Sequence, residues 1–438
     1  MTPRTRSQQG SVLIAVLVII FAVLLIGASL FTLGVGESDV VDYHGDGAKA
    51  FYLAEAGVER AWVWLEQMAT HDPPLFPSEV DLPGEVLGEG TYSLHLERES
   101  SGSTWSVRYE VTSTGIVDGV DRQVRVVLEN ETFAQYLYFA DEMEEIWFIS
   151  GDTLRGKVHT NGFIRIAGDP WFDKKVTTAQ DEFIMWGESW PTFAEGYELG
   201  VPEIPLPVTA AMIDGFESLA DDGGLAPGPL NGRRAKYEVV LGRSGLSGYL
   251  TYRSYERVSG SYQWSPWIDV DIGSTNGVAW FDEPVDVSGV LDGQLTIASS
   301  GDIRIVDDVT YAGSSPGQGP TPGGDDVLGL ASARNVIVAL TAPNMSDCEI
   351  HAHMMALNSS FTAEDYGEGD PRGTLSIWGG LAQQKQGAVG MFNWSGLVHG
   401  YQKDYHYDSN LLRMSPPGYP PTGKYILVSW EEIREPEA

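Results

Sequence analysis

Residues 11–33 read SVLIAVLVIIFAVLLIGASLFTL, an apolar run without a charged side chain that begins directly after Gly10. Its few polar side chains belong to Ser11, Ser29 and Thr32. At 1.5 Å per residue, a helix of this length extends about 35 Å, which is enough to cross a bilayer. The run is too long for the apolar region of an ordinary secretory signal, and no A-x-A cleavage site closes it. We therefore expect a membrane-spanning helix.

Charged residues flank this run asymmetrically. Arg4 and Arg6 lie before it, whereas Glu37, Asp39 and Asp42 follow it. Positively charged flanks stay in the cytoplasm, so the N-terminus is expected there and the rest of the chain on the other side of the membrane. The pattern predicts a single-pass inner-membrane protein with a periplasmic or extracellular body.

The helical pattern continues beyond the membrane run. Apolar residues recur at steps of three and four, as in an amphipathic helix: Phe51, Ala54, Val58, Ala61, Leu65 and Met68. Glycines at positions 34, 36, 45 and 47 predict a break or kink between the two parts. We expect one long, interrupted helix over residues 11–71 that packs its apolar stripe on a folded domain.

Residues 10–33, followed by AFYLAEAGVERA at residues 50–61, resemble the N-terminal domain of PilX-type minor pilins. In that group a run ending in A-E-A-G closes the helix. Gly10 stands directly before the apolar run, where prepilin peptidases cut, so the resemblance implies a leader of residues 1–10 and a mature chain beginning at Ser11. It also implies a structural subunit of a type IV pilus or a type II secretion pseudopilus.

The same resemblance implies which residues serve the membrane helix and assembly: Val12, Leu13, Ala15, Phe51, Ala54 and Val58. The implied partners are other minor pilins, the pilus or secretion assembly platform, the prepilin peptidase and the inner membrane. The processed protein is then expected at the cell surface or pilus tip, where it initiates assembly, caps the fibre or adheres.

Ala15 departs from the major pilins. It is the fifth residue of the expected mature chain, where major pilins carry a glutamate that neutralises the N-terminal amine of the neighbouring subunit. Leaving that amine buried and unpaired is costly, so Ala15 disfavours a repeating position in the fibre shaft. Ser11 also differs from the Phe or Met usual at the first mature position. These residues favour a rare, terminal subunit.

Residues 72–131 predict a small antiparallel sheet. Prolines at positions 73, 74, 77 and 83 end the helix and form a loop. Three strand-like segments follow, at Tyr92–Arg98, Trp105–Gly115 and Val120–Glu129, separated by turn residues. A helix that covers one face of such a sheet is the pilin α+β arrangement.

Residues 132–438 read as many short strands separated by Gly, Asp and Asn. Alternating pairs such as Val285 and Val287, or Ile303 and Ile305, recur every eight to ten residues. This texture fits a parallel β-solenoid (parallel β-helix) or a sandwich, and the very short strands favour the solenoid. An aromatic-rich β insertion is expected at about 235–283. Most of residues 133–421 resemble an uncharacterised bacterial domain found behind PilX-like N-termini, which supplies no biochemical activity.

Composition supports a mainly β, exported protein. The 438 residues include 51 Gly and 24 Pro, which favour turn-rich β structure over a helical bundle. The formal net charge of −34 repels nucleic acid, so we expect no nucleic-acid partner. Cys348 is the single cysteine, which excludes an intrachain disulfide and is expected to be a small buried hydrophobe.

His351 and His353 form the most metal-like pair. On a strand, Ile350, Ala352 and Met354 share the core face, so both histidines point the other way and are interpreted as exposed. An H-x-H pair binds zinc only with further ligands, and the remaining candidates are scattered along the chain: His159, His399 and His406.

Asp269 and Asp271 place carboxylates at alternating positions before a Gly-Ser-Thr-Asn-Gly run, as calcium loops do. A bidentate Glu at EF-hand spacing is missing, and Asp282 and Glu283 are the nearest substitutes. We expect no cofactor, and structural calcium is the weaker alternative to an ordinary Asp/Gly turn.

Two acidic pairs, Asp307-Asp308 and Asp325-Asp326, are interpreted as turn residues, because adjacent carboxylates on a strand point in opposite directions. No Walker loop, dinucleotide fingerprint, G-x-S-x-G or H-E-x-x-H occurs in the sequence. The sequence therefore predicts a protein that is not an enzyme. The alternatives are a membrane-anchored β-helical carbohydrate-active enzyme, a carbohydrate-binding surface protein, and a plain anchored surface protein without a pilus link.

Overall fold

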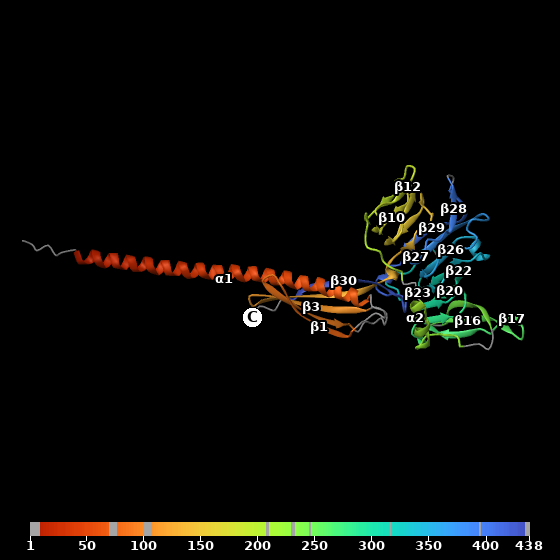
Figure 1. The fold of residues 1–438 in the computed structure, drawn as a ribbon, viewed down its shortest axis with the longest axis horizontal. Coiled ribbons are helices and arrows are strands. Elements are labelled where there is room, and N and C mark those ends of the chain that lie inside the picture. The colour runs from red at the N-terminus through yellow and green to blue at the C-terminus, as the bar shows by residue number, and fades with distance from the viewer. Residues whose placement is uncertain are drawn as a thin grey trace, which may run out of the picture. The chain divides into compact units, whose positions relative to one another are not determined.

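The computed structural model describes residues 9–69, 77–99, 107–206, 210–228, 233–244, 247–315, 317–393 and 396–433 (Figure 1). The chain is mainly β, with one long N-terminal helix. It divides into two compact units. The helix–sheet unit comprises residues 1–100, 108–129 and 425–438, and the β unit comprises residues 101–107 and 130–424.

Helix α1 (Gln9–Ala69) runs for 61 residues without interruption. Its length corresponds to about 90 Å at 1.5 Å per residue. The break predicted at the glycines of positions 34, 36, 45 and 47 is wrong. Each glycine weakens a helix by about 1 kcal/mol but keeps its backbone donor and acceptor, so the hydrogen-bond ladder continues through these positions.

The helix–sheet unit contains one five-stranded sheet. Its strands are β1 (Glu79–Leu87), β2 (Gly90–Arg98), β3 (Arg108–Val117), β4 (Val120–Thr132) and β30 (Pro421–Ile433), in that spatial order. Strands β1 to β4 form an antiparallel meander. The last three of these correspond to the three predicted strands.

Two strands of this sheet were not expected. Pro83 favoured a loop, yet it lies in β1, an edge strand whose register shifts between Leu82 and Glu85. An edge strand with a bulge tolerates a residue that cannot donate a backbone hydrogen bond. Strand β30 comes from the far end of the chain, which was expected to belong wholly to the large β block. The alternation of apolar and polar residues within β30 does not reveal which strand it pairs with.

The second half of α1 covers one face of this sheet. Its buried residues fall at helical spacing: Ala50, Leu53, Ala54, Gly57, Val58, Ala61, Leu65 and Ala69. The buried sheet residues are Tyr92, Leu94, Leu96, Tyr109, Val111, Val124, Val126 and Leu128. Four members of the predicted stripe are therefore buried, whereas Phe51 and Met68 at its margin are half-buried.

The β unit begins with a stack of short parallel strands. The strands are β5 (Tyr138–Glu142), β6 (Phe148–Ile149), β7 (Thr153–Arg155), β8 (Val158–Thr160), β9 (Arg165–Ala167), β10 (Trp171–Phe172), β11 (Val176–Thr178), β12 (Ile184–Trp186), β13 (Thr192–Phe193) and β14 (Tyr197–Leu199). Three parallel ladders result, with orders β6-β9-β12, β7-β10-β13 and β8-β11-β14. Every third strand therefore repeats the same position in the stack.

Helix α2 (Ala210–Asp221) and an antiparallel meander follow. The meander contains β15 (Arg234–Ser244), β16 (Ser247–Val258), β17 (Ser261–Trp264) and β18 (Ile268–Asp271). It occupies the segment expected as an aromatic-rich β insertion. Helix α2 was not predicted.

The chain then returns to parallel stacking. The strands are β19 (Val278–Phe281), β20 (Val285–Leu291), β21 (Gln294–Ser299), β22 (Ile303–Tyr311), β23 (Val327–Ser332), β24 (Val336–Val338), β25 (Cys348–Ala356), β26 (Phe361–Ala363), β27 (Pro371–Lys385), β28 (Gly390–Asn393) and β29 (Gly396–Tyr407). Most pair in parallel with the strand two positions later in sequence.

The two parallel stacks join directly. Leu381 of β27 lies opposite Tyr138 of β5, and Tyr405 of β29 lies opposite Leu154 of β7, both in parallel register. The chain therefore enters the combined stack in its middle, at β5. Strands β6 to β14 extend one end, and strands β19 to β29 start at the other end and lead back to the middle. Strand lengths in the two stacks range from two residues in β10 to 15 in β27, which fits the absence of a strict repeat period in the sequence.

Two apolar layers hold the β unit together. Inward-facing residues of the parallel strands form one core, which includes Leu154, Phe172, Ile305, Ile350 and Ile377. A second core lies on the outer side of one ladder. It is covered by α2 and by short helical turns, among them Phe133–Gln135 and Ser409–Leu412. The other short turns are Ile272–Ser274 and Pro343–Met345.

Candidate assembly helix and polar sites of the β unit

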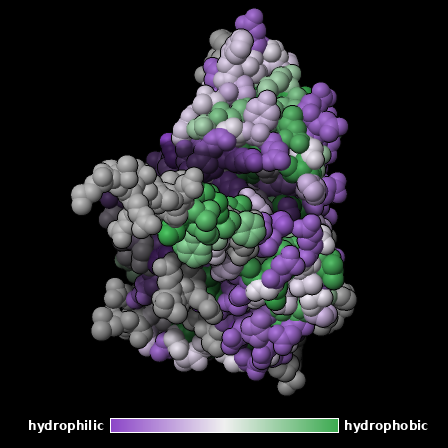
Figure 2. Space-filling view, turned by 90° about the vertical axis from the view of Figure 1, so that its left-hand side faces the viewer, coloured by the Kyte–Doolittle hydropathy of each residue, from purple (hydrophilic) through white to green (hydrophobic). Residues whose placement is uncertain are grey.

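The N-terminal half of α1 is apolar and uncovered. Leu13–Thr32 is long and apolar enough to cross a membrane, and none of it is buried in the described structure. Viewed from the side of the helix N-terminus, a group of apolar side chains faces outward (Figure 2). Leu13 and Ala15 are exposed, whereas the exposure of Gly10, Ser11 and Val12 is not among the described features.

The second half of α1 meets the sheet through its smallest residues. A Cβ atom on Gly115 of β3 would lie 2.0 Å from the carbonyl oxygen of Ala50 and 2.7 Å from the backbone nitrogen of Ala54. A Cβ atom on Gly57 would also overlap its neighbours in the sheet. Ala54 and Gly57 belong to the A-E-A-G run. The close approach of helix and sheet explains why small residues are needed in that run.

Phe51 and Glu55 contact β30. The rings of Phe51 and Trp430 meet edge to face with their centroids 6.3 Å apart. Trp430 Nε1 donates a 2.8 Å hydrogen bond to Glu55 Oε1. Sequence reasoning missed Trp430 because the contact joins residues at opposite ends of the chain. Val58, by contrast, is buried against the sheet as its place in the stripe predicts.

His351 and His353 lie opposite the core face of β25, but neither is exposed. His351 Nδ1 accepts a hydrogen bond from the Tyr311 backbone amide, and its Nε2 lies 2.8 Å from Glu349 Oε1. His353 Nε2 lies 3.2 Å from the carbonyl oxygen of Tyr136. The expectation of exposed histidines is wrong because loops and turns cover the outer face of this strand as well.

Burial disfavours the charged form of both histidines. It lowers the pKa of His353 to about 3 and also lowers the pKa of His351, whose carboxylate neighbour acts in the opposite direction. The other histidines considered as zinc ligands are engaged elsewhere. His406 stacks on Trp378 with ring centroids 3.9 Å apart, and His399 Nδ1 contacts the carbonyl oxygen of Gly369.

His159 and Asn161 form a buried polar network. His159 Nδ1 lies 2.8 Å from Thr177 Oγ1, and its Nε2 lies 2.9 Å from Asn161 Oδ1. Asn161 accepts from the Ile204 amide and donates to the Ile204 carbonyl, at 3.0 and 2.8 Å. Burial lowers the pKa of His159 to about 4. These hydrogen bonds hold the segment around Ile204, which follows β14, against the first parallel stack.

A buried ion pair joins the two parallel stacks. Lys403 Nζ of β29 lies 3.1 Å from Asp152 Oδ2, and the two side chains are only 9% and 0% exposed. Asp152 Oδ2 also accepts a 3.1 Å hydrogen bond from the Ile149 amide. Sequence reasoning missed this pair because 251 residues separate its members.

The acidic residues considered for calcium have separate partners. Asp269 Oδ1 accepts from Thr251 Oγ1 at 2.8 Å, and Asp271 Oδ1 accepts from the Gly273 amide at 2.9 Å. Asp282 accepts from the Tyr237 hydroxyl at 2.5 Å. Among the described residues, no group of three or more His, Cys, Asp or Glu side chains is arranged to hold a metal ion.

The adjacent acidic pairs bind backbone amides, but Asp307 and Asp308 lie within β22 and are not the turn residues that the sequence predicted. Asp308 Oδ1 accepts from the Glu349 amide at 2.8 Å, and Asp326 Oδ1 accepts from the Gly293 amide at 2.7 Å. Burial raises the pKa of both carboxyl groups. Cys348 is buried in the core, where burial raises the pKa of its thiol. These contacts tie neighbouring strands and turns together.

Comparisons with known proteins find one family match over part of the chain and a solved structure with low sequence identity. A family profile described as a domain of unknown function (DUF4900) matches residues 89–180. The solved structure titled "Crystal structure of competence-associated pilin ComZ from Thermus thermophilus" matches with 12% sequence identity and a TM-score of 0.31. That match covers 89% of this chain and 97% of that chain. No curated protein matches the chain.

Proposed function

We propose that this chain is a minor pilin-like structural subunit, of the PilX type, in a type IV pilus or a type II secretion pseudopilus. One observation carries the proposal. Within the single continuous helix α1, Leu13–Thr32 is apolar and uncovered, whereas the buried positions from Ala50 to Ala69 pack on an antiparallel sheet.

The uncovered half of α1 requires an apolar environment. An exposed apolar surface of this size is rare on soluble proteins and marks a membrane or protein contact. In the proposal, the inner membrane covers it first, with the N-terminus in the cytoplasm, and helices of other subunits cover it after assembly. Cleavage by the prepilin peptidase between Gly10 and Ser11 separates the two stages.

Ala15 supports a terminal position in the fibre. It is exposed on α1 and carries no charge that would compensate the N-terminal amine of a neighbouring subunit. A subunit with a β unit of about 300 residues is also easier to accommodate at a tip than within a packed shaft. The proposed roles are therefore assembly initiation, capping or adhesion.

The in-register parallel pairing of the β unit supports a β-solenoid architecture. Equivalent strands such as β7, β10 and β13 stack directly, and their inward residues Leu154, Phe172 and Phe193 line up in one row. Stacked coils of this kind make a scaffold whose uncovered outer faces are available for display.

We further propose that the chain is not an enzyme. Glycoside hydrolysis needs two carboxyl groups that converge across a cleft, one of them with a raised pKa. A groove of about 470 Å³ contains Glu364, Asp365 and Glu368. Hydrogen bonds from Arg304 lower the pKa of Glu364, which makes it a poor general acid.

The test is N-terminal sequencing of the protein from cells with and without the prepilin peptidase. We expect a mature chain that begins at Ser11 only when the peptidase is present, and recovery of that chain with sheared pili or pseudopili. A chain that begins at Met1, or is cut elsewhere, would contradict the pilin role and favour a plain anchored surface protein.

A further inference from the structure

The β unit has one outer sheet face that combines exposed aromatic rings with paired ions. Its central row crosses neighbouring strands at directly opposed positions: Arg253, Glu238, Asp286, Arg304, Ile337 and Thr362. Apart from Ser254, the adjacent residues on each strand belong to the core. At about 4.8 Å per strand, the row is about 24 Å long.

Aromatic residues lie at the β16–β17 end of this face. The guanidinium carbon of Arg253 lies 4.3 Å from the ring centroids of both Trp264 and Trp267. Tyr255 stacks on Tyr262 with a centroid separation of 5.4 Å. Trp267 is 44% exposed. The rings are therefore fixed in position and still accessible.

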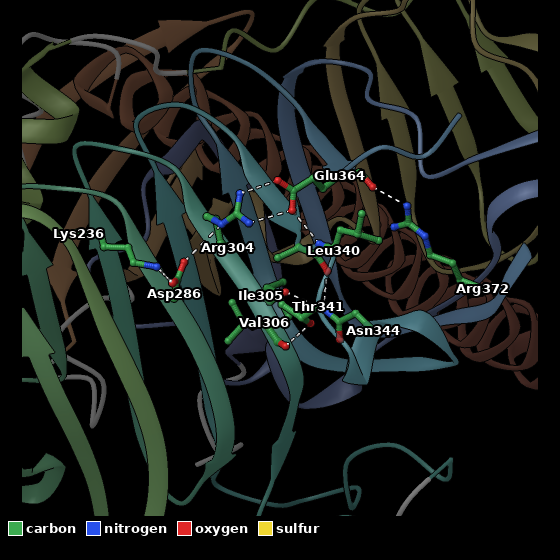
Figure 3. A network of polar contacts seen from close by, with 11 residues as sticks. Lys236, Asp286, Arg304, Ile305, Val306, Leu340, Thr341, Asn344, Glu364 and Arg372 are labelled. Carbon is green, nitrogen blue, oxygen red and sulfur yellow. Dashed lines mark hydrogen bonds and ion pairs between the residues drawn. The ribbon is translucent and has the colours of Figure 1, made fainter. Parts of the chain in front are cut away.

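A chain of ion pairs continues along the row (Figure 3). Lys236 Nζ lies 2.5 Å from Asp286, which also lies 3.4 Å from Arg304 Nε. Arg304 donates to both carboxylate oxygens of Glu364, at 3.1 and 2.8 Å. At the aromatic end, Arg253 pairs with Glu238 at 2.5 Å. The charged side chains of the row are thus neutralised by one another.

The row ends in the shallow groove beside the turn after β26. Ile337, Thr362 and Ala363 line it together with residues 364–368. Tyr366 is 38% exposed at this end. The face therefore has an accessible aromatic ring at each end and polar side chains of fixed geometry between them.

We propose that this face binds an extended, uncharged polysaccharide. Sugar rings present C–H faces that pack on aromatic rings and hydroxyl groups that exchange hydrogen bonds with fixed charged side chains. The ion pairs among Lys236, Asp286, Arg304 and Glu364 offset one another's charge. The exposed Asp365 and Glu368 of the groove add negative charge that repels acidic ligands. The chain's net charge of −34 further repels acidic polymers.

The proposal rests on the proposed function, because the pilin-like subunit would display this binding face outside the cell. Its test uses the isolated chain and does not require a pilus. The detergent-solubilised full chain is titrated by calorimetry with cellohexaose, chitohexaose, maltohexaose and xylohexaose, and with hexagalacturonate as the acidic probe. We expect at least one uncharged hexasaccharide to bind, and hexagalacturonate to bind more weakly.

Two variants at opposite ends of the face locate the site. Trp267→Ala and Tyr366→Ala are each expected to weaken binding about tenfold, because each removes one stacking ring. Trp186→Ala is the matched control, since Trp186 is 72% exposed but lies on β12, outside this face. Thermal unfolding confirms that each variant is folded.

Three results would overturn the proposal: no uncharged hexasaccharide binds at millimolar concentration, only hexagalacturonate binds, or both face variants bind as the wild type does. Correct N-terminal processing together with any of these results would leave the pilin role intact. Glycan binding without processing at Gly10 would remove the pilin role and keep the binding site.

Discussion

Gly57 on α1 faces Ser113 on β3 so closely that a Cβ atom at position 57 would lie 2.1 Å from the hydroxyl oxygen of Ser113. The same atom would lie 3.1 Å from side-chain carbons of Leu94 and Tyr92. Because the helix contributes no side chain here, Gly57→Ala is expected to overpack the interface and cost about 1–3 kcal/mol of unfolding free energy. Chemical denaturation of the detergent-solubilised chain measures this cost.

Gly45→Ala is the matched control. Gly45 lies on the same helix with no atom within 4 Å of the position its Cβ would take, so alanine should stabilise the helix by up to about 1 kcal/mol. Adding Ser113→Ala to Gly57→Ala removes the closest atom and should restore part of the lost stability. Equal effects of the two glycine substitutions would show that the helix does not pack closely at Gly57.

Local patterns in the sequence were sufficient to predict the apolar stripe of α1 and strands β2 to β4 of the helix–sheet unit, but not β1. Residues Ala54, Val58, Ala61 and Leu65 recur at helical spacing, and all four are buried. The strand predicted over Val120–Glu129 likewise has a buried face, which includes Val124 and Val126. These elements follow from burial of one side of a regular backbone, which depends only on nearby residues.

Pairings between strands that are far apart in the chain could not be predicted from the sequence. Strand β30 joins the first sheet although it follows the β unit, and β27 pairs with β5 across most of the chain. The burial of His351 and His353 depends on the segments that cover β25, which a strand pattern does not reveal. The predicted processing, assembly and ligand roles remain predictions for the experiments above.

The ion pair between Lys403 and Asp152 is expected to be essential for the junction of the two stacks. Lys403→Met leaves Asp152 buried without its counter-ion and should cost about 3–5 kcal/mol of unfolding free energy. Chemical denaturation again provides the measurement. Adding Asp152→Leu removes the orphaned charge and should recover part of the loss.

The matched control for this pair is Lys174→Met. Lys174 lies 2.5 Å from Glu195, but both side chains are about half exposed, so its removal should change stability by less than about 1 kcal/mol. A similar small effect at Lys403 would mean that water reaches Asp152 and that the junction does not depend on the pair.

Acid is expected to destabilise the β unit through its buried histidines. Burial lowers the pKa of His353 to about 3, below the ordinary value of 6.5 that applies to the unfolded chain. Between pH 6.5 and about pH 3, His353 is therefore protonated in the unfolded chain but not in the folded chain. The stability contribution of His353 is fully present above pH 6.5 and is lost progressively as the pH is lowered, by about 2 kcal/mol at pH 5.

His353→Gln tests this dependence. Glutamine can donate to the carbonyl oxygen of Tyr136 as His353 Nε2 does, but it does not titrate. Denaturation at pH 7 and pH 5 should show a smaller loss of stability in the variant than in the wild type. His95→Gln should not reduce the loss, because a hydrogen bond with Asp81 raises the pKa of His95. A wild-type pH response in His353→Gln would refute the assignment.

Membrane insertion of α1 should tolerate one buried charge and fail with two. Fourteen residues between Leu13 and Thr32 are Leu, Ile, Val or Phe, which together favour insertion by about 4–8 kcal/mol. One arginine near the centre costs about 2.5–3.5 kcal/mol, so Val23→Arg should remain membrane-bound. Val18→Arg combined with Val23→Arg removes most of the gain, and the chain should become extractable by alkaline carbonate. Val41→Arg with Val63→Arg, two exposed positions beyond the apolar segment, should stay in the membrane, because insertion depends on Leu13–Thr32 and not on the rest of α1.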